Sequence, residues 1–408
     1  MRKQLITACK RLFFIWCVWS ILFTGYELIR LDIPLVMHLY EEEAMTVLSG
    51  SEKKISPEKL HLDFVGDVQL EIAEDGGYQA ACNLFGVIPL KTVEIEVVSR
   101  EKLIPGGIPV GIYIETDGVF VIGTGDIETA YGKINSPAKN ILKTGDYIIS
   151  LQGEKITKKQ ELVEFLEDFS GHEIIIGIRR NDEEFVVSVE PLYVEGKCYL
   201  GLWVRDDTQG VGTLTYVAEN KRFGALGHGI SDADSDLLME SQQGKMYDCE
   251  ILAIIKGNEG TPGKLAGKIV YSDKKLYGKV LENRNCGIYG IANEMLLQKL
   301  KKDKIPIALK HEVREGEAVI LCSVDGQLKE YKVQIRKIHK GEQEVNKGME
   351  LVVTDKELLE LTGGIVQGMS GSPIIQDGKL VGAVTHVLVN DPTRGYGIFI
   401  ENMLEAAE

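Results

Sequence analysis

Apolar residues form one long run near the N-terminus and many short runs after it. The first run, residues 12–24, contains Trp16 and Trp19, carries no acid and follows four Lys or Arg residues. Apolar neighbours extend it toward the roughly 20 residues that a helix needs to cross a bilayer. Because the cations come first, we expect the N-terminus to stay in the cytoplasm and the bulk of the chain to be translocated. Residues 24–27 form a poor cleavage site, so we predict an uncleaved signal anchor over residues 1–30. A cleaved signal peptide is the alternative.

Residues 31–100 show strand-like patterning without visible chemistry. Apolar and acidic residues alternate along Val93-Glu94-Ile95-Glu96-Val97, which is the period of a half-buried strand. We therefore predict a stalk and a small β-rich unit over this stretch.

From about 101 to 192 the pattern changes to short strands, tight turns and one helix. The apolar positions Leu162, Phe165, Leu166 and Phe169 recur at helical spacing and predict an amphipathic helix over 160–169. Strands are expected at 111–114, 118–123, 147–151, 173–178 and 184–189.

This segment resembles a PDZ domain. The resemblance rests on Ser136-Pro137-Ala138, on Leu142-x-x-Gly145-Asp146-x-Ile148 and on the strand pair around Asn181. It implies a domain that binds an extended peptide as an added strand. The nearest candidate for the glycine loop that holds a peptide carboxylate is Ile104-Pro105-Gly106-Gly107. A small packing module that binds nothing is the alternative.

Residues 193–408 are punctuated by glycine and rich in short apolar runs. Examples are 213–217, 251–255, 268–271 and 318–322. Such runs predict a mainly antiparallel β domain, and their spacing does not distinguish a barrel from a sandwich.

Length and charge narrow the class of protein. The 408 residues suggest two or three compact units. A net charge of −15 argues against nucleic-acid binding, which needs a basic surface. The seven cysteines include no CxxC pair, so we expect neither a zinc site nor any other metal or cofactor.

The strongest chemical signal is the run Gly368-Met369-Ser370-Gly371-Ser372-Pro373. Its glycines permit the backbone angles of a sharp turn that would expose the Ser370 hydroxyl. The amides of Gly368 and Ser370 can then form an oxyanion hole. Ser372 is the competing nucleophile, but it occupies the second glycine position of the Gly-x-Ser-Gly-x-Pro pattern. In chymotrypsin-like peptidases the strand after the nucleophile lines the specificity pocket, which assigns Thr385 and His386 to that pocket.

The residue before the serine restricts the mode of activation. Trypsin-type enzymes carry an acid there that pairs with a newly formed N-terminus, whereas this chain has Met369. We therefore expect no activation by insertion of a new N-terminus.

Two histidines are candidates for the general base. His228 stands between glycines in Phe223-Gly224-Ala225-Leu226-Gly227-His228-Gly229, and His386 follows Ser370 on the presumed pocket strand. A histidine that precedes its serine fits the His-Asp-Ser order, which favours His228. A structural histidine in a glycine-rich turn is the alternative reading.

Spacing does not settle the orienting carboxylate. Asp232, Asp234 and Asp236 follow His228 closely, but no glycine completes a calcium loop there, and a solvated turn is expected. Asp355 lies at the end of an apolar strand, where an acid could be held rigidly. Residue patterns alone do not rank Asp355 above Asp391.

At this point the chain resembles a known family of sporulation serine peptidases, the stage IV sporulation protein B (SpoIVB) family. The resemblance covers nearly the whole chain. It is most specific at 223–228, at Thr362-Gly363-Gly364-Ile365-Val366-Gln367 leading into the serine motif, and at the tail 382–393. It implies a triad of His228, Asp355 and Ser370, and thereby selects the acid that spacing left open.

The resemblance also implies a biological role. Members act between the two membranes around the forespore, where they cleave a regulator of an intramembrane metalloprotease that processes pro-sigma-K. Their PDZ domain is implicated in self-recognition, self-cleavage and target contact. Expected partners are thus a protein substrate, a peptide or a second copy at the PDZ-like unit, and the membrane through the anchor.

These inferences combine into one expected architecture. The fold is mainly β with an α+β module: a transmembrane anchor (1–30), a stalk and small β unit (31–100), a PDZ-like domain (101–192) and a chymotrypsin-like peptidase domain (193–408). Two other functions fit the same sequence. A non-catalytic PDZ scaffold would carry a degenerate peptidase fold, and a general quality-control protease would digest unfolded proteins broadly.

Overall fold

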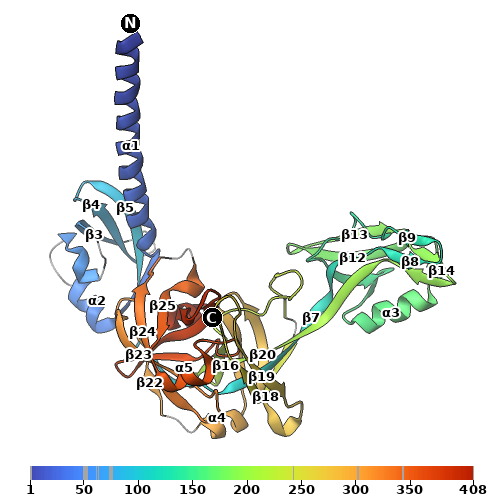
Figure 1. The fold of residues 1–408 in the computed structure, drawn as a ribbon. Helices are drawn as coiled ribbons and strands as arrows, with labels where there is room; N and C mark the ends of the chain where they lie inside the picture. The colour runs from blue at the N-terminus through green and yellow to red at the C-terminus, as the bar shows by residue number, and fades with distance from the viewer. Residues whose placement is uncertain are drawn as a thin grey trace.

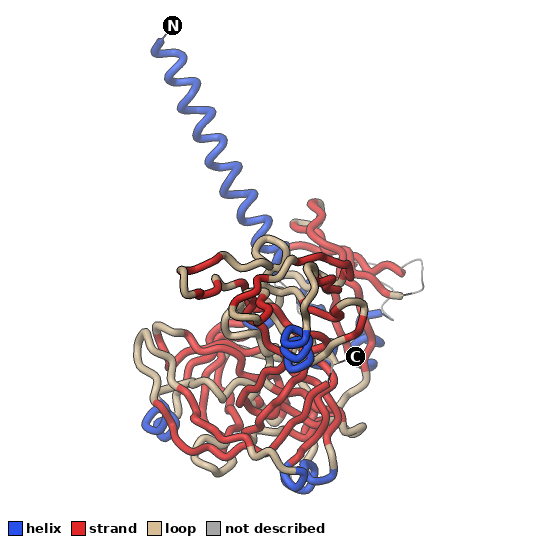
Figure 2. The backbone as a smooth tube through the Cα atoms, turned by 90° about the vertical axis from the view of Figure 1, so that its right-hand side faces the viewer, coloured by secondary structure: helices blue, strands red, loops and turns tan. Residues whose placement is uncertain are grey.

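The computed structural model describes residues 2–48, 54–60, 62, 64–72, 77–241, 243–300, 303–341 and 344–407. The protein is mainly β, with one long helix projecting from a body of sheets (Figures 1 and 2). The predicted fold class is confirmed.

The long helix is α1 (Arg2–Asp32). Its segment Lys10–Asp32 has a mean hydropathy of 1.8, and the most apolar window of this segment has no buried residue. The segment therefore has the length and composition of a membrane span, while Tyr26 and Ile29 near its C-terminal end pack against the folded body. The same features fit a signal sequence, and the helix contains the predicted apolar run 12–24.

A small sheet follows α1 and lies beside its C-terminal part (Figure 1). Its strand order is β1-β5-β4-β3-β2, with β1 parallel to β5 and the other pairs antiparallel. Its core includes Leu39, Val68, Ala80 and Val93. The elements of this N-terminal unit are β1 (Val36–Tyr40), α2 (Glu41–Leu48), β2 (Lys54–Ile55), η1 (Pro57–Leu60), β3 (Gly66–Ile72), β4 (Tyr78–Leu84) and β5 (Ile88–Val98).

Six strands close into a first barrel. Their pairings run β7-β18-β20-β21-β17-β16, and β16 pairs back to β7. The interior includes Ile112, Leu214, Phe223, Met246 and Ile288. The elements in and beside this barrel are β6 (Lys102–Pro105), β7 (Pro109–Thr124), β16 (Leu202–Val217), β17 (Arg222–Ala225), β18 (Gln243–Ile255), β19 (Lys264–Ile269), η2 (Asp273–Lys275), β20 (Leu276–Arg284), β21 (Gly287–Ala292), α4 (Glu294–Leu300) and β22 (Ile305–Pro306).

The PDZ-like unit is an insertion at one end of this barrel. The long strands β7 and β16 leave the barrel as a pair and reach the unit at their far ends (Figure 1). Asp146 of the PDZ-like motif is fully buried and binds Arg180 through two hydrogen bonds of 2.6 and 2.7 Å. Its elements are β8 (Ile127–Thr129), β9 (Gly132–Ile134), β10 (Tyr147–Leu151), β11 (Glu154–Lys155), α3 (Lys159–Asp168), β12 (Ile174–Arg180), β13 (Glu183–Val189), β14 (Leu192–Val194) and β15 (Lys197–Tyr199).

The pairings divide the chain differently from the predicted limits of 101 and 192. The first half of β7, residues 109–115, pairs with β16 and β18 inside the first barrel. Gly106 and Gly107 donate hydrogen bonds to Thr215 and Leu214 of β16. The segment 104–107, a candidate carboxylate loop by sequence, is therefore part of the peptidase barrel. Sequence patterning missed this because the two halves of β7 belong to different units without a break in the strand.

The second barrel is closed by six strands in the order β23-β24-β25-β28-β27-β26. Its core contains Ile320, Val333, Leu351, Met369 and Phe399. A barrel, and not a sandwich, is thus the form of the C-terminal β region. Its elements are β23 (Gly316–Cys322), β24 (Lys329–Ile338), η3 (Val345–Lys347), β25 (Met349–Val353), α5 (Lys356–Thr362), β26 (Pro373–Gln376), β27 (Lys379–Leu388), β28 (Asp391–Phe399) and α6 (Ile400–Glu405).

Candidate active site

Ser370 and His228 meet at one cavity between the two barrels. His228 follows β17 of the first barrel, and Ser370 precedes β26 of the second. Both side chains line a cavity of about 420 Å³, together with Thr385 and His386 of β27. Gly368 lines the same cavity, so five of the six predicted site residues meet there, and Asp355 is the one that does not.

The nucleophile loop depends on two glycines with left-handed backbone angles. Gly368 has φ +100° and Gly371 has φ +94°, values that L side chains rarely adopt. A Cβ at Gly371 would lie 2.1 Å from the carbonyl oxygen of Thr213. The loop therefore packs directly on β16, as the glycines of the motif suggested.

The two serines of the motif have different surroundings. Ser372 is fully buried, and its hydroxyl donates a 2.6 Å hydrogen bond to the carbonyl of Met369. Ser370 is partly exposed at the cavity. Only Ser370 is thus placed to reach a substrate. Met369, for its part, is buried in the core of the second barrel.

The amides of the nucleophile loop divide into two groups. Met369 donates to Val366, Gly371 to Val384 and Ser372 to Met369. Within the described part of the chain, the amides of Gly368 and Ser370 donate no hydrogen bond. They are the two amides that the sequence assigned to an oxyanion hole, and they remain available to a substrate oxygen.

His228 has the tautomer that a general base needs. Its Nδ1 lies 2.8 Å from the carbonyl oxygen of Gly229. Because a carbonyl only accepts, Nδ1 carries the proton, and in the neutral ring Nε2 keeps its lone pair. Burial lowers the pKa of His228, an effect that the Gly229 hydrogen bond partly opposes. The ring is therefore neutral over a wider pH range than an exposed histidine.

Thr213 of β16 joins the histidine loop to the nucleophile loop. Its amide donates a 2.9 Å hydrogen bond to the carbonyl of Ser370, and its own carbonyl accepts from the amide of Leu226 at 3.1 Å. Its hydroxyl donates to the carbonyl of Gly368 at 2.8 Å. One buried residue thus fixes both sides of the site. Sequence reasoning missed Thr213, because a threonine in an apolar strand gives no signal of its own.

The hydroxyl of Ser370 is engaged by the pocket strand. It donates a 2.6 Å hydrogen bond to the carbonyl of Thr385, while the buried Thr385 hydroxyl donates to the carbonyl of Asn346. The ring of His386 lies 5.1 Å from that of His228, centroid to centroid. Burial lowers the pKa of His386 to about 4, and unfavourable interactions of its charged form with His228 and Lys347 add to this effect.

No carboxylate contacts His228 among the described residues. Asp355 caps α5: its Oδ1 accepts from the amide of Leu358 at 3.1 Å and its Oδ2 from the amide of Lys332 at 3.2 Å. Asp391 accepts from the amide and hydroxyl of Thr393. The structure thus assembles His228 and Ser370, and the role of Asp355 stays a prediction.

The acids that follow His228 serve the local fold. Asp232 is buried, pairs with Arg205 and accepts hydrogen bonds from the amides of Asp234 and Ser235. Asp232 therefore stabilises the turn as a buried residue, whereas the sequence suggested a solvated turn, which describes Asp234 and Asp236.

Asn283 is a second residue that sequence reasoning missed. It lies on β20, and its side-chain oxygen accepts from the amide of Ile230, while its side-chain nitrogen donates to the carbonyls of Ile230 and Met239. These bonds hold the segment immediately after His228. A single asparagine in a strand has no sequence pattern that would predict this role.

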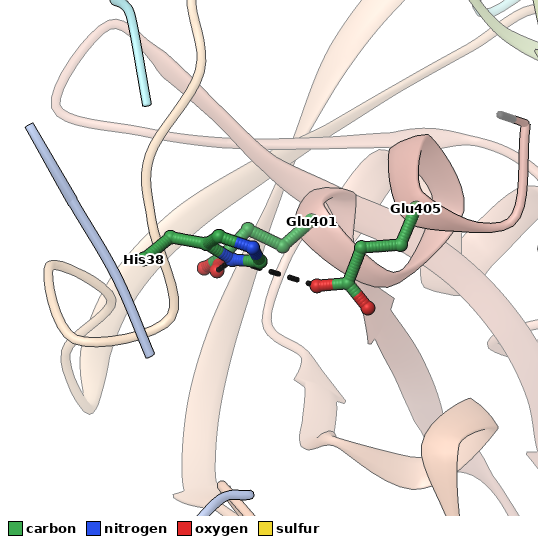
Figure 3. A group of neighbouring side chains, drawn as sticks. All are labelled: His38, Glu401 and Glu405. Carbon is green, nitrogen blue, oxygen red and sulfur yellow. Dashed lines mark hydrogen bonds and ion pairs between the residues drawn. The ribbon is translucent and has the colours of Figure 1, made fainter. Parts of the chain in front are cut away.

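One group of side chains away from the cavity has the spacing of metal ligands. His38 of β1 lies against Glu401 and Glu405 of α6, as Figure 3 shows. His38 Nδ1 is 2.8 Å from Glu401, and Nε2 is 3.0 Å from Glu96. Because ionised carboxylates only accept, two N–H groups on the ring satisfy this arrangement. The same acids raise the pKa of His38, which identifies the group as an ionic link between the N-terminal unit and α6.

The two barrels, the serine at a glycine-held turn and the base-ready histidine define a serine peptidase with an inserted PDZ-like unit. A family model described as SpoIVB peptidase S55 matches residues 196–404, slightly over half of the chain. The protein belongs to this SpoIVB peptidase family. A search of the curated proteins found no match.

Several solved structures share local similarity with the chain. The PDZ domain of the SdrC-like protein from Listeria monocytogenes is 19% identical, with a TM-score of 0.18, and the match covers 22% of this chain and 90% of that one. The inactive form of the Rv3671c protease is 13% identical (TM-score 0.28; 48% and 84% covered). The HtrA-type protease AlgW with a decapeptide is 10% identical (TM-score 0.27; 50% and 53% covered).

Proposed function

We propose that the protein is a membrane-tethered serine endopeptidase in which His228 activates Ser370. The observation that carries the proposal is the meeting of these two side chains at one cavity, with the Nδ1 proton of His228 held by Gly229. The amides of Gly368 and Ser370 supply the hydrogen-bond donors of the proposed oxyanion hole.

In the proposed reaction the Ser370 hydroxyl leaves the Thr385 carbonyl and donates to Nε2 of His228. Both side chains line the same cavity, so this change requires the Ser370 side chain to turn within it. Oγ then attacks the scissile carbonyl carbon while its proton passes to His228. The amides of Gly368 and Ser370 stabilise the oxyanion. His228 returns the proton to the leaving amine, and water hydrolyses the acyl-enzyme by the reverse sequence.

Asp355 is the proposed third member, on the strength of the family resemblance. A carboxylate behind the imidazole would stabilise the imidazolium formed during attack. In the structure this carboxylate caps α5 and does not bind His228. Its proposed role is therefore to stabilise the charged ring in the substrate complex. A cap-preserving variant tests the role directly.

The cavity suits an uncharged substrate side chain. Apart from the two histidines, its lining carries no ionisable group, and most of it is apolar: Val211, Leu226, Pro262, Ile365, Val366, Val387 and Val389. A charged side chain would lose its hydration there without a partner. We therefore propose cleavage next to small or medium apolar residues.

The family resemblance supplies the proposed biology. The anchor would hold the enzyme in the space between the forespore and mother-cell membranes. There it would cleave a regulator of an intramembrane metalloprotease, which leads to processing of pro-sigma-K. The PDZ-like unit would bind a peptide of the target or of a second copy during self-cleavage.

The direct test is cleavage by the full chain in detergent or liposomes. Wild-type protein should release a defined fragment of itself and cleave an apolar-site peptide, and Ser370→Ala should do neither while keeping its circular dichroism spectrum. Casein should stay largely intact if the enzyme is a narrow signalling peptidase. Undiminished self-cleavage by the Ser370→Ala variant would refute the proposal.

A further inference from the structure

The turn between β4 and β5 exposes apolar side chains that have no place in the catalytic account. Val65, Phe85 and Val87 are 71%, 67% and 78% exposed, and Ile88 is exposed beside them. Val65 belongs to the same surface because its carbonyl accepts a 2.8 Å hydrogen bond from the amide of Phe85. We call these four residues the apolar tip. Contiguous exposed apolar groups mark an interaction surface.

Two contacts place the apolar tip relative to α1. The Lys91 ammonium donates to the carbonyl of Ile33 at 2.6 Å, and the Tyr26 hydroxyl donates to the carbonyl of Pro89 at 2.9 Å. Ile33 directly follows α1, and Tyr26 lies about two turns earlier in the helix. The N-terminal direction along β5, from Lys91 to Pro89, therefore runs alongside the N-terminal direction along α1. The turn between β4 and β5 precedes Pro89 along the chain and so continues in that direction, and β5 itself lies beside the C-terminal part of the helix (Figure 1).

That direction leads toward the apolar stretch of α1. The residues of the helix beyond Tyr26 include Leu22 and Phe23, both well exposed in the chain by itself. They belong to the segment whose composition fits a membrane span. The apolar tip and this part of the helix thus expose apolar side chains at similar positions along the axis of α1.

We propose that the apolar tip inserts into the outer surface of the bilayer that α1 crosses. The inference rests on the proposed membrane anchor. A shallow insertion of apolar side chains lowers their exposure to water at the headgroup boundary, as it does for interfacial segments. Asp67 lies next to Gly86 at the tip, so the attraction is apolar and does not require anionic lipid.

The insertion would fix the orientation of the peptidase. The N-terminal unit is tied to the second barrel through His38 and Glu401. With the helix as one point of attachment and the tip as another, the body could no longer rotate freely about α1. The cavity would therefore face a constant direction relative to the membrane.

Depth-dependent quenching in the full chain tests this proposal. The protein is reconstituted in phosphatidylcholine liposomes with an environment-sensitive fluorophore on one introduced cysteine. Val87→Cys reports on the tip and Leu22→Cys on the anchor. Ile72→Cys is the matched control, because Ile72 is equally exposed at the opposite end of β3. The partly exposed Cys17 and Cys286 are first replaced by serine, and Cys9→Ser is added because Cys9 belongs to the anchor segment.

The proposal expects spin-labelled lipid to lower the fluorescence at Val87 about twofold or more, as for an interfacial side chain, and to leave Ile72 unaffected. Iodide should quench Ile72 and spare Val87. Quenching by lipid at Leu22 with Val87 as open to iodide as Ile72 would overturn the insertion and leave the anchor standing. A Leu22 probe open to iodide would overturn the anchor and the insertion together.

Discussion

The hydroxyl of Ser370 donates its hydrogen bond to the carbonyl oxygen of Thr385, at 2.6 Å. His228, the proposed base, is therefore not its partner in this conformation, although it lines the same cavity. In the proposed mechanism this is the resting state, in which β27 holds the hydroxyl of the nucleophile. Substrate in the pocket would contact the same strand and could release the hydroxyl toward His228.

The two serines of the motif should respond in opposite ways to truncation. Ser370→Ala should lower kcat/KM by about a thousandfold or more, because the nucleophile is lost. Ser372→Ala should keep most of the activity and destabilise the fold by about 1 kcal/mol through the lost Met369 hydrogen bond. Peptidase assays with denaturant unfolding measure both effects. Loss of activity in a folded Ser372→Ala variant, with Ser370→Ala active, would reverse the assignment.

Alanine variants should separate the two candidate bases. His228→Ala should reduce kcat/KM by at least about a thousandfold, as removal of a triad base does. His386→Ala should affect KM more than kcat, because His386 lines the pocket and its pKa of about 4 makes it a weak base. Steady-state kinetics on both variants decides. Equal kcat losses in the two variants would contradict a single base.

The pH profile should show a displaced acid limb. The base must be neutral to accept the proton of Ser370, and burial lowers the pKa of His228. Activity should therefore persist below pH 6.5, the ordinary range of histidine, before it falls. The logarithm of kcat/KM against pH gives the pKa of the free enzyme. A limb centred well above 6.5 would exclude the buried, neutral His228 as the base.

Asp355→Asn tests the third member of the triad without removing the helix cap. The asparagine oxygen can keep the cap on Leu358. Its NH2 group cannot accept from the amide of Lys332, so the variant should lose about 1 kcal/mol of stability. If Asp355 supports the imidazolium, kcat should still fall by up to about 10⁴-fold. Asp355→Ala is the control for the loss of the cap, which costs about 1 kcal/mol. Full activity of Asp355→Asn would limit Asp355 to capping α5.

The ionic link at His38 should make the stability of the protein depend on pH. Glu401 first, and then Glu405 and Glu96, raise the pKa of His38 above 6.5, while burial opposes this rise. Lys310 is the nearby cation, 3.8 Å from Glu405. The contribution is complete below pH 6.5 and is lost as the pH rises through the raised pKa.

His38→Gln should therefore destabilise the protein by about 1.5–3 kcal/mol near pH 6 and by less near pH 8, given the strength of hydrogen bonds to charged groups. Denaturant unfolding at the two pH values measures the difference. An equal loss at both would show that His38 acts through packing and not through its charge.

Local patterns predicted the elements better than they predicted their assembly. The strand over 147–151 matches β10, and the helix over 160–169 matches α3 within one residue at each end. Each has a period that a short window contains. The continuous strand β7 was divided, because alternation along 109–124 carries no mark of where one unit ends and another begins.

The site shows the same limit. Ser370, Gly368 and His228 could be proposed from the sequence as site residues, because glycines mark the turns that hold them. Thr213 and Asn283 could not, because their hydrogen bonds join segments that only the assembled barrel brings together. The bond from His228 to the carbonyl of Gly229 is local, but it depends on a side-chain conformation that the sequence does not give. Asp355 was selected by the family resemblance and not by its spacing from His228 or Ser370. In the structure its hydrogen bonds are those of a helix cap.

Covalent labelling tests the central claim most directly. A fluorophosphonate probe reacts with a serine only when a base activates it, so the full chain is treated with the probe, digested and analysed by mass spectrometry. The account predicts an adduct on Ser370 that is absent from Ser372 and disappears in the His228→Ala variant. An unlabelled Ser370 in the folded wild-type protein, or labelling that survives His228→Ala unchanged, would contradict it.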